Sequence, residues 1–527
     1  MRADIEAPEL RKAIANVFSK RKGPGGGTVL EWLRTAPGKH GPASLIDVTG
    51  KISHLKSLGV DKWSLRALKQ VKALRDLELQ GIKELPGDFD VGIADPVWHD
   101  LLNQGDRKKA LGALRACAMT SVRRGLRGGR IWVDHSWSHR NRQDLLITAE
   151  DWKKDRVSLI RALSLTPDPQ KYLERVHAAL EVCLGELSTA ISKGTVEVDS
   201  AGHVRLPAIV AMDADPEATR NRDAMFDIIG EAQFGDLLVE LDAHVGFSEA
   251  LLGSRAKTSQ DLTALYGALL AHGTENDARG VAAMIPGLEV SHILAAMRSL
   301  EGHGRLRRAN DRIVAFQRKH AIAELWGKGD KASADMMSLD ASRHLYNARL
   351  EPRRGTRAAG IYTHVMGSYG VFYDQPVILN ERQAGPAVQG VEDYNTNTTD
   401  GIRLLLLAVD THGYTNVAMA VAKLLGFDLC VRLQNLAERK IFLPRGFELA
   451  ENLDRLKIAH VSERAIVKGW DELLRLIASI RGGNLSAKEA LDKLGSAAIG
   501  DTMHKAADEL GKLLRTIFLC PTPSDEI

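Results

Sequence analysis

The sequence has little cysteine, few aromatic residues and no long apolar run. Its 527 residues include four cysteines, Cys117, Cys183, Cys430 and Cys520, and none of them forms a CxxC pair. A disulfide scaffold and a cysteine-rich zinc module are therefore excluded, and reduced thiols in a cytoplasmic setting are expected. The longest apolar runs, such as Leu404–Val409, are too short to span a bilayer, so no membrane segment is expected.

An excess of charge of one sign is also missing. The 71 basic residues nearly balance the 67 acidic ones, for a net charge of +4, which excludes a bulk polycation but leaves room for local basic surfaces. Aromatic residues make up only 5%, too few for an extended platform that stacks single-stranded bases. With 44% hydrophobic and 26% charged residues, the chain is typical of a well-packed protein of three or four domains.

The apolar pattern predicts a mixed fold in four stretches. Residues 1–100 should form a helical amino-terminal part with a basic, glycine-rich arm, KRKGPGGG, at 20–27. Residues 101–325 should form a helical scaffold or DNA-contacting region with a small hairpin at 194–212. Residues 326–450 are predicted to form an α/β domain, and residues 451–527 a helical segment.

Within the α/β stretch, short apolar runs typical of strands are interspersed with segments of helical periodicity. Strands are predicted at 360–365, 370–379, 403–409 and 427–433, and helices at 384–394 and 415–425. The run RLLLLAV at 403–409 is continuously apolar, as is typical of a buried parallel strand.

Asp410, which ends that strand, is the strongest local candidate for chemistry. Open α/β sheets bind their ligands at the carboxyl ends of strands, and a carboxylate there needs a cation or a donor nearby. Asp335, 75 residues upstream, is a candidate partner, because two carboxylates on neighbouring strands can hold divalent ions for phosphoryl transfer. Asp340 competes for that role, and Asp410 could instead cap the helix that begins near Thr415.

Two basic segments are candidates for phosphate contacts. Residues 104–142 hold ten basic residues against two acidic ones, and Trp132 and Trp137 lie among them. Binding there would be salt-sensitive and largely independent of sequence; the alternative is a solvated helix face over buried tryptophans. The arginines expected to contact DNA are Arg123, Arg124, Arg127 and Arg130 in this segment, and Arg353 and Arg354 in a second run that also contains Arg343, Arg349 and Arg357.

Four further residues have two interpretations each. His412 and Tyr414 could touch a phosphate or water, although packing at the start of the next helix is the alternative. His135 and His139 have the spacing of helical zinc ligands, but no third ligand and no HExxH glutamate accompany them, which favours polar surface residues.

Three passages resemble the catalytic region of the large replicative transposases of the Tn-three family. They are WGKGDKASADMMSLDASRHLYNAR from Trp326, RAAGIYTHVMGSYGVFYDQPVILNERQAG from Arg357, and LAVDTHGYTNVAMAVAKLLGFDLCVRLQNLAERKIFLP from Leu407. The similarity extends in the same order over nearly the whole chain and is densest after Trp326.

The resemblance implies an RNase H-like catalytic core at 326–450 with two aspartates and a glutamate. The family's first aspartate, after a Trp-Gly-x-Gly and small-residue run, falls on Asp335 rather than Asp340, and the second falls on Asp410. It also implies Mg²⁺, or else Mn²⁺, as cofactor. The implied reaction is 3′-end nicking and strand transfer on double-stranded DNA, at the terminal inverted repeats and the target, by a homodimer.

The chain departs from the family pattern at its end. The family's glutamate lies in a Gly-Glu motif downstream of the Leu-Arg-Thr-Ile-Phe-Leu segment, which here is Leu514–Leu519, and neither Glu526 nor an earlier glutamate has that context. The third carboxylate is therefore expected to be missing and the chain to be a fragment. The alternatives to an active transposase are an inactive, DNA-binding remnant that interferes with an intact copy and, third, a nuclease without strand transfer.

Overall fold

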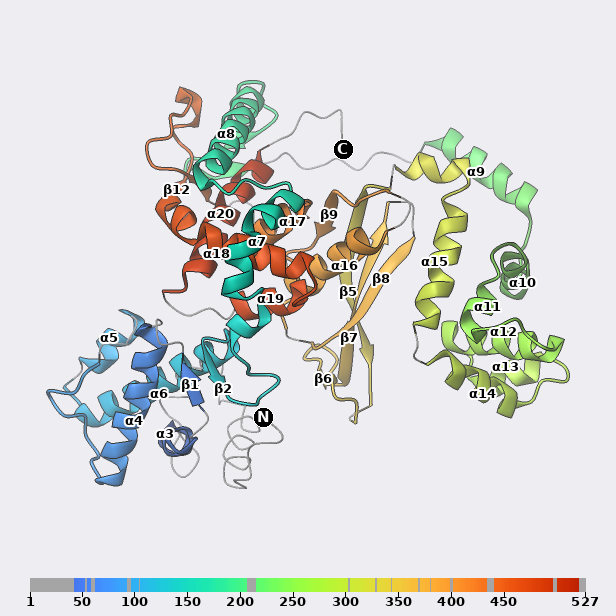
Figure 1. Ribbon diagram of the computed structural model, residues 1–527. Helices are drawn as coiled ribbons and strands as arrows, with labels where there is room; N and C mark the ends of the chain where they lie inside the picture. The colour runs from blue at the N-terminus through green and yellow to red at the C-terminus, as the bar shows by residue number, and fades with distance from the viewer. Residues whose placement is uncertain are drawn as a thin grey trace.

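The structure is a computed structural model, and Figure 1 shows how its helices and strands are arranged. Its buried hydrophobic side chains form three cores. It describes residues 42–520 except 53–54, 58–61, 92–95, 104, 206–214, 302–303, 328, 343, 368–369, 380, 399–400, 434–439 and 496–499. The basic arm expected at 20–27, Arg343 and Glu526 lie outside these residues. Within them, no helix combines the length and apolar character needed to cross a bilayer.

The first core lies among residues 46–131. Its elements are α3 (Pro42–Lys51), β1 (Leu55–Ser57), α4 (Lys62–Leu79), α5 (Pro96–Leu102), α6 (Arg107–Arg127) and β2 (Ile131–Val133). The expectation of a helical part at 1–100 is wrong at β1, which pairs antiparallel with β2. That pairing depends on a partner about 75 residues away, which local periodicity does not report.

The second core lies among residues 247–309, and its described residues come mainly from helices. Its helices are α10 (Phe234–Val245), α11 (Phe247–Leu252), α12 (Ser259–Gly273), α13 (Ala278–Met284), α14 (Val290–Leu300) and α15 (Arg305–Gln317). The helix α9 (Pro216–Ile229), which has no buried residue, precedes them, and the turn η3 (Ala321–Trp326) follows. α15 reaches the sheet, because the Asn310 side chain hydrogen-bonds the carbonyl of Val371 and Arg307 lies over the Tyr373 ring.

The third core is the largest and joins residues 145–196 to residues 332–520. Its helices are α7 (Ala149–Ala162), α8 (Pro169–Ser192), α16 (Ala384–Asn397), α17 (Asn416–Leu425), α18 (Glu463–Arg481), α19 (Ala487–Leu494) and α20 (Thr502–Leu519). Its strands are β3 (Glu197–Val198), β4 (Val204–Arg205), β5 (Lys331–Asp340), β6 (Arg349–Leu350), β7 (Arg357–Met366), β8 (Val371–Val377), β9 (Leu406–Val409), β10 (Asp428–Val431), β11 (Ile441–Leu443) and β12 (Ile458–His460). The cores thus group the chain differently from the four expected stretches.

The main sheet has six strands in the order β10-β9-β5-β7-β6, and β8 also pairs with β7. β7 is antiparallel to β5 and to β8, whereas β9 is parallel to both β5 and β10. The helices α16 and α17 follow β8 and β9, as predicted. Thr415 caps the start of α17 through the amide of Ala418, and Gly426, at φ 96°, ends the helix in a left-handed conformation that glycine adopts without strain.

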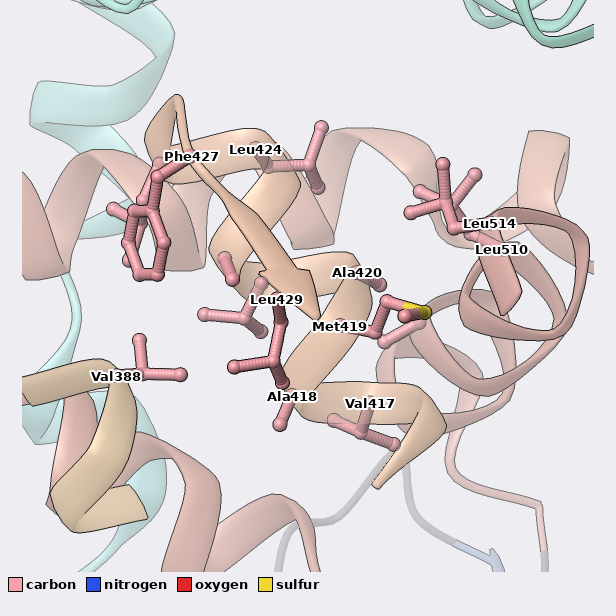
Figure 2. Close-up of a cluster of buried hydrophobic side chains, with 14 of the residues drawn as sticks. Val388, Val417, Ala418, Met419, Ala420, Leu424, Phe427, Leu429, Leu510 and Leu514 are labelled. Carbon is pink, nitrogen blue, oxygen red and sulfur yellow. The ribbon is translucent and has the colours of Figure 1, made fainter. Parts of the chain in front are cut away.

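One face of this sheet is covered by helices. The covered face presents Ala334, Tyr362, Leu407 and Leu429, all buried. Figure 2 shows Leu429 of β10 near Ala418 of α17 in the centre of the cluster, with Val388 of α16 at the left and Leu510 and Leu514 of α20 at the right. The opposite face, called the open face here, leaves Met337 57% exposed and Leu339 44% exposed on β5. Apolar burial therefore holds the sheet from one side.

The carboxy-terminal helices are part of this core. A Cβ on Gly511 of α20 would lie 1.8 Å from the carbonyl oxygen of Asn416, so α20 rests directly on the first turn of α17. Asp501, the N-cap of α20, forms a 2.6 Å ion pair with Arg142, and both side chains are buried. Burial alone would raise the pKa of Asp501, but Arg142 and the amide of His504 outweigh it and lower that pKa.

His364 makes the sheet sensitive to acid. Its ring on β7 is fully buried, and Nε2 donates to the carbonyl of Ala387 at 2.9 Å. Burial disfavours the imidazolium and lowers the pKa of His364 from 6.5 to about 4. Between these values the unfolded chain binds a proton that the folded chain does not, so the unfolding free energy should fall by about 3 kcal/mol as the pH drops from 7 to 4.

The measurement is urea unfolding at several pH values for the parent chain and for His364→Gln. Other groups titrate equally in both proteins, so the difference in slope isolates His364. Between pH 7 and pH 4, we expect the unfolding free energy of the variant to lack the pH dependence that corresponds to the binding of about one proton on unfolding. Equal slopes in both proteins would contradict the assignment.

Candidate active site

Asp335 and Asp410 lie side by side on neighbouring strands. The last residues paired between the parallel strands β5 and β9 are Ala334 and Val409, and each aspartate follows directly. Neighbouring strands lie about 5 Å apart, and residues in register share a face of the sheet. Ala334 and Val409 are buried on the covered face, so both carboxylates belong to the open face, where Asp335 is exposed and Asp410 half-buried.

Asp410 is held by the tight turn that follows β9. Its Oδ1 accepts hydrogen bonds from the backbone amides of His412 and Gly413, both at 2.9 Å. The alternative that Asp410 caps the next helix is wrong, because Thr415 does so. Asp410 therefore keeps one oxygen in the turn and leaves Oδ2 with no hydrogen bond from the described residues.

Asp340 lies at the far end of the same strand and is already paired. Its carboxylate accepts a hydrogen bond from the Thr356 hydroxyl at 2.8 Å and forms an ion pair with Arg354 at 3.2 Å. Five residues of strand separate it from Asp335, which corresponds to about 17 Å. The structure therefore brings Asp335, and not Asp340, beside Asp410.

The open face carries a further carboxylate in the same row. Asp335 pairs with Thr363 of β7, and Thr363 pairs with Asp374 of β8, which is exposed. Asp374 is thus two strands, or about 10 Å, from Asp335. Among the described residues, no three His, Cys, Asp or Glu side chains lie close enough together to bind one metal ion.

Beneath the two aspartates lies Tyr362 of β7. Its side chain is fully buried, and its hydroxyl has no hydrogen-bond partner. Burial first, and then the negative charges of Asp410 and Asp335, raise the pKa of Tyr362 above its usual value, so the phenol stays protonated. The sequence analysis missed this residue, which gave no signal beyond its place in an apolar β-rich run.

The donor set suits a hard divalent cation. Mg²⁺ binds carboxylate oxygens and commonly takes only one or two of them, with water and phosphate completing its shell. Two adjacent carboxylates, one exposed and one with an available oxygen, meet that description. Neither forms an ion pair with a described basic side chain, so a cation would also relieve their mutual repulsion.

The side chains that follow Asp410 are placed in two different ways. His412 is exposed beside the aspartate turn. Tyr414 is half-buried, and its hydroxyl donates to Oδ1 of Asn416 at 2.5 Å. Asn416 in turn donates to Asp508 of α20 at 2.9 Å. Tyr414 is thus engaged in packing at the start of α17, which was the alternative interpretation.

The arginines expected to contact DNA lie in two regions apart from the aspartates. On α6, which belongs to the first core, Arg123, Arg124 and Arg127 are exposed. Arg130 is only 5% exposed and lies over the Trp63 ring, so the fold does not present it to a phosphate. The two tryptophans of this segment differ in exposure, because Trp132 is half-buried and Trp137 is 79% exposed.

The second arginine region is the turn between β6 and β7, at one end of the sheet (Figure 1). Arg353 and Arg354 are exposed there, but Arg354 is already paired with Asp340 and also donates to the carbonyl of Ser338 at 2.9 Å. Arg349 is engaged too, because it donates to the carbonyls of Tyr346 and Ala348. Arg353 is therefore the better presented member of the pair.

His135 and His139 do not share a helix. β2 ends at Val133, and turns follow it, with His135 at φ 65°. Burial lowers the pKa of His139, which favours its neutral form. The two residues therefore do not have the helical arrangement of zinc ligands, which the sequence analysis had already disfavoured.

Comparison with known proteins decides the family. The sequence pattern of the Tn3 transposase DDE domain matches residues 236–526, more than half of the chain. The chain belongs to the Tn3 transposase family. The match includes Asp335 and Asp410 and every element from α11 to α20.

Tn3 transposases are similar to this chain over most of its length. The transposase for insertion sequence element IS1071 in transposon Tn5271 of Comamonas testosteroni is 38% identical over 453 residues, which are 86% of this chain and 46% of that protein. The transposases for transposon Tn501 of Pseudomonas aeruginosa and transposon Tn21 of Escherichia coli are 26% and 24% identical, with the same two coverages. The chain thus spans about half the length of these relatives.

Proposed function

We propose that this chain carries the DNA-cleaving core of a Tn3-type transposase, which nicks the 3′ ends of a transposon and joins them to target DNA. The observation that carries the proposal is the adjacency of Asp335 and Asp410 within the family match. An RNase H-like fold is part of the proposal. It is supported by the sheet, in which the antiparallel strands β5, β7 and β8 are followed by β9 and β10, parallel to β5 on its other side.

The aspartates would hold Mg²⁺, or Mn²⁺ in its place. When bound, such an ion supplies a Lewis acid that activates water or a 3′-hydroxyl and stabilises the leaving oxygen. The chain's own part is to orient the ligands, because the turn fixes Asp410 through two amides and the sheet fixes Asp335 beside it. Without a cation, the two carboxylates would repel a DNA phosphate.

Exposed arginines would supply the contacts to double-stranded DNA, at the terminal inverted repeats and at the target. Arg123, Arg124 and Arg127 on α6 and Arg353 in the β6–β7 turn are exposed. Such contacts position a duplex without reading its sequence, and they make its binding weaken as salt rises. The homodimer stays a prediction.

The proposal is tested by nicking of supercoiled plasmid DNA in Mg²⁺ or Mn²⁺, an assay that does not require the chain's own recognition sequence. We expect the parent chain to nick and Asp335→Asn to lose at least a thousandfold in rate, because this change removes one of two charges that act together. Asp340→Asn is the matched control. It alters an aspartate of the same strand that is paired with Arg354, and its rate should stay within a few-fold of the parent rate.

Equal losses in Asp335→Asn and Asp340→Asn would contradict the assignment. A parent chain that binds DNA in a salt-sensitive way but never nicks it would instead favour the inactive remnant. Linear ends joined to a second plasmid would distinguish a transposase from a nuclease without strand transfer.

A further inference from the structure

The hydroxyl of Tyr362 is an unexplained polar group at the centre of the fold. The side chain is fully buried in the main sheet, and its oxygen neither donates nor accepts a hydrogen bond among the described residues. Buried polar atoms nearly always form a hydrogen bond, because a buried atom without one has lost its hydrogen bonds to water and gained no other. A phenylalanine would fill the same space without that penalty, so packing alone does not account for a tyrosine.

The position of this hydroxyl connects it to the aspartate pair. A Cβ on Gly413 would lie 2.9 Å from the Tyr362 oxygen and 2.8 Å from Cβ of Val409, so the hydroxyl touches the underside of the aspartate turn. The amide of Gly413 is one of the two donors that hold Oδ1 of Asp410. The phenol therefore lies against the backbone that orients one carboxylate, and it approaches from the covered face of the sheet.

We infer that Tyr362 is a positioning residue for the aspartate pair, whose hydroxyl supports, from the covered face, the turn that orients the Asp410 carboxylate toward a divalent cation. The inference rests on the proposed function and adds a residue to it. Tyr362 is buried and does not touch DNA. Groups that hold a metal ligand in place without touching the metal are part of its site, and their loss commonly weakens metal binding by tenfold or more.

The lack of a side chain at Gly413 belongs to the same arrangement. Its φ is not in the left-handed region, so the backbone does not require glycine at this position. The requirement is steric, because any side chain there would occupy the space between the turn and the Tyr362 hydroxyl. The glycine thus keeps the path from the phenol to the turn open.

The test is Tyr362→Phe in the full chain, with two readouts. Bound Mn²⁺ is measured by the loss of the electron paramagnetic resonance signal of the free ion, and stability by the urea midpoint without metal. We expect an affinity for Mn²⁺ about tenfold weaker and a urea midpoint equal to or higher than that of the parent, since the unpaired hydroxyl is gone. A structural role alone would not separate the two readouts in this way.

Tyr373→Phe is the matched control. Tyr373 lies on the adjacent strand β8, and its hydroxyl faces Asp393 and Arg307 rather than the aspartate pair. Its removal should leave Mn²⁺ affinity unchanged. Parental Mn²⁺ affinity in Tyr362→Phe, or a loss of affinity together with a lower urea midpoint, would overturn the inference while leaving the proposed function intact. A parent chain whose Mn²⁺ binding does not depend on Asp335 and Asp410 would overturn both.

Discussion

Replacing Asp410 by alanine is expected to abolish DNA nicking and also to destabilise the fold by about 1–2 kcal/mol, whereas asparagine should abolish nicking alone. The two effects separate because Asp410 has two tasks. Its Oδ1 accepts hydrogen bonds from the amides of His412 and Gly413, and its charge faces Asp335. An asparagine oxygen can hold the same turn without the charge, while alanine leaves both amides unpaired.

The measurement pairs the plasmid nicking rate with the unfolding free energy from urea titration. Asp335→Ala serves as the control, because the Asp335 carboxylate accepts a hydrogen bond only from the amide of the next residue, Met336, and its side chain is exposed. It should lose at least a thousandfold in rate, like Asp410→Ala, with little change in stability. An Asp410→Asn chain as unstable as Asp410→Ala would show that charge, and not the turn, stabilises this region.

Replacing Gly511 by alanine is expected to destabilise the chain by about 3 kcal/mol or more and to reduce Mn²⁺ binding at the aspartate pair. The added Cβ would lie 1.8 Å from the carbonyl oxygen of Asn416 and 2.8 Å from its Cα. Both are backbone atoms, so no rotamer change relieves the clash, and α20 must move away from α17. Asn416 begins α17 only three residues after Gly413, so the movement would reach the aspartate turn.

Gly185→Ala is the matched control for this substitution. Gly185 also lies inside a long helix, α8, but it is exposed, and no atom lies within 4 Å of a Cβ built there. Alanine is the better helix former, so this change should stabilise the chain by about 0.5–1 kcal/mol. Urea unfolding of both variants checks the prediction, and a Gly511→Ala chain of parental stability would mean that α20 does not rest on α17 as described.

Much of the α/β region was predictable from local patterns. The helix expected at 415–425 is α17, at 416–425, with Thr415 and Gly426 at its ends, because caps act through neighbouring residues. The buried strand expected at 403–409 is shorter, at 406–409, and the helical segment expected at 451–527 contains α18, at 463–481, followed by α19 and α20. The expected hairpin within 194–212 is present as β3 and β4.

The errors arise where distant segments decide the outcome. β1 was expected to be helical, but its strand depends on β2 far along the chain. Arg130 was expected to face DNA, but the packing of α6 and Trp63 buries it. The carboxy-terminal helices were expected to form a stretch of their own, although Leu510 and Leu514 lie in the same core as the sheet. Sequence periodicity reports which face of a helix is apolar and does not report which partner covers it.

The sequence by itself determined the family of this protein, the alternation of strands and helices between residues 360 and 433, and the aspartates Asp335 and Asp410 as candidates for its chemistry. These properties depend on residue order and local spacing, which the sequence states directly. Only the tertiary structure decided that the two aspartates lie in register, that Asp340 does not join them, and that the Tyr362 hydroxyl lies beneath their turn. Each of these depends on strand register and on contacts between residues far apart in the chain, which form only when the whole core packs.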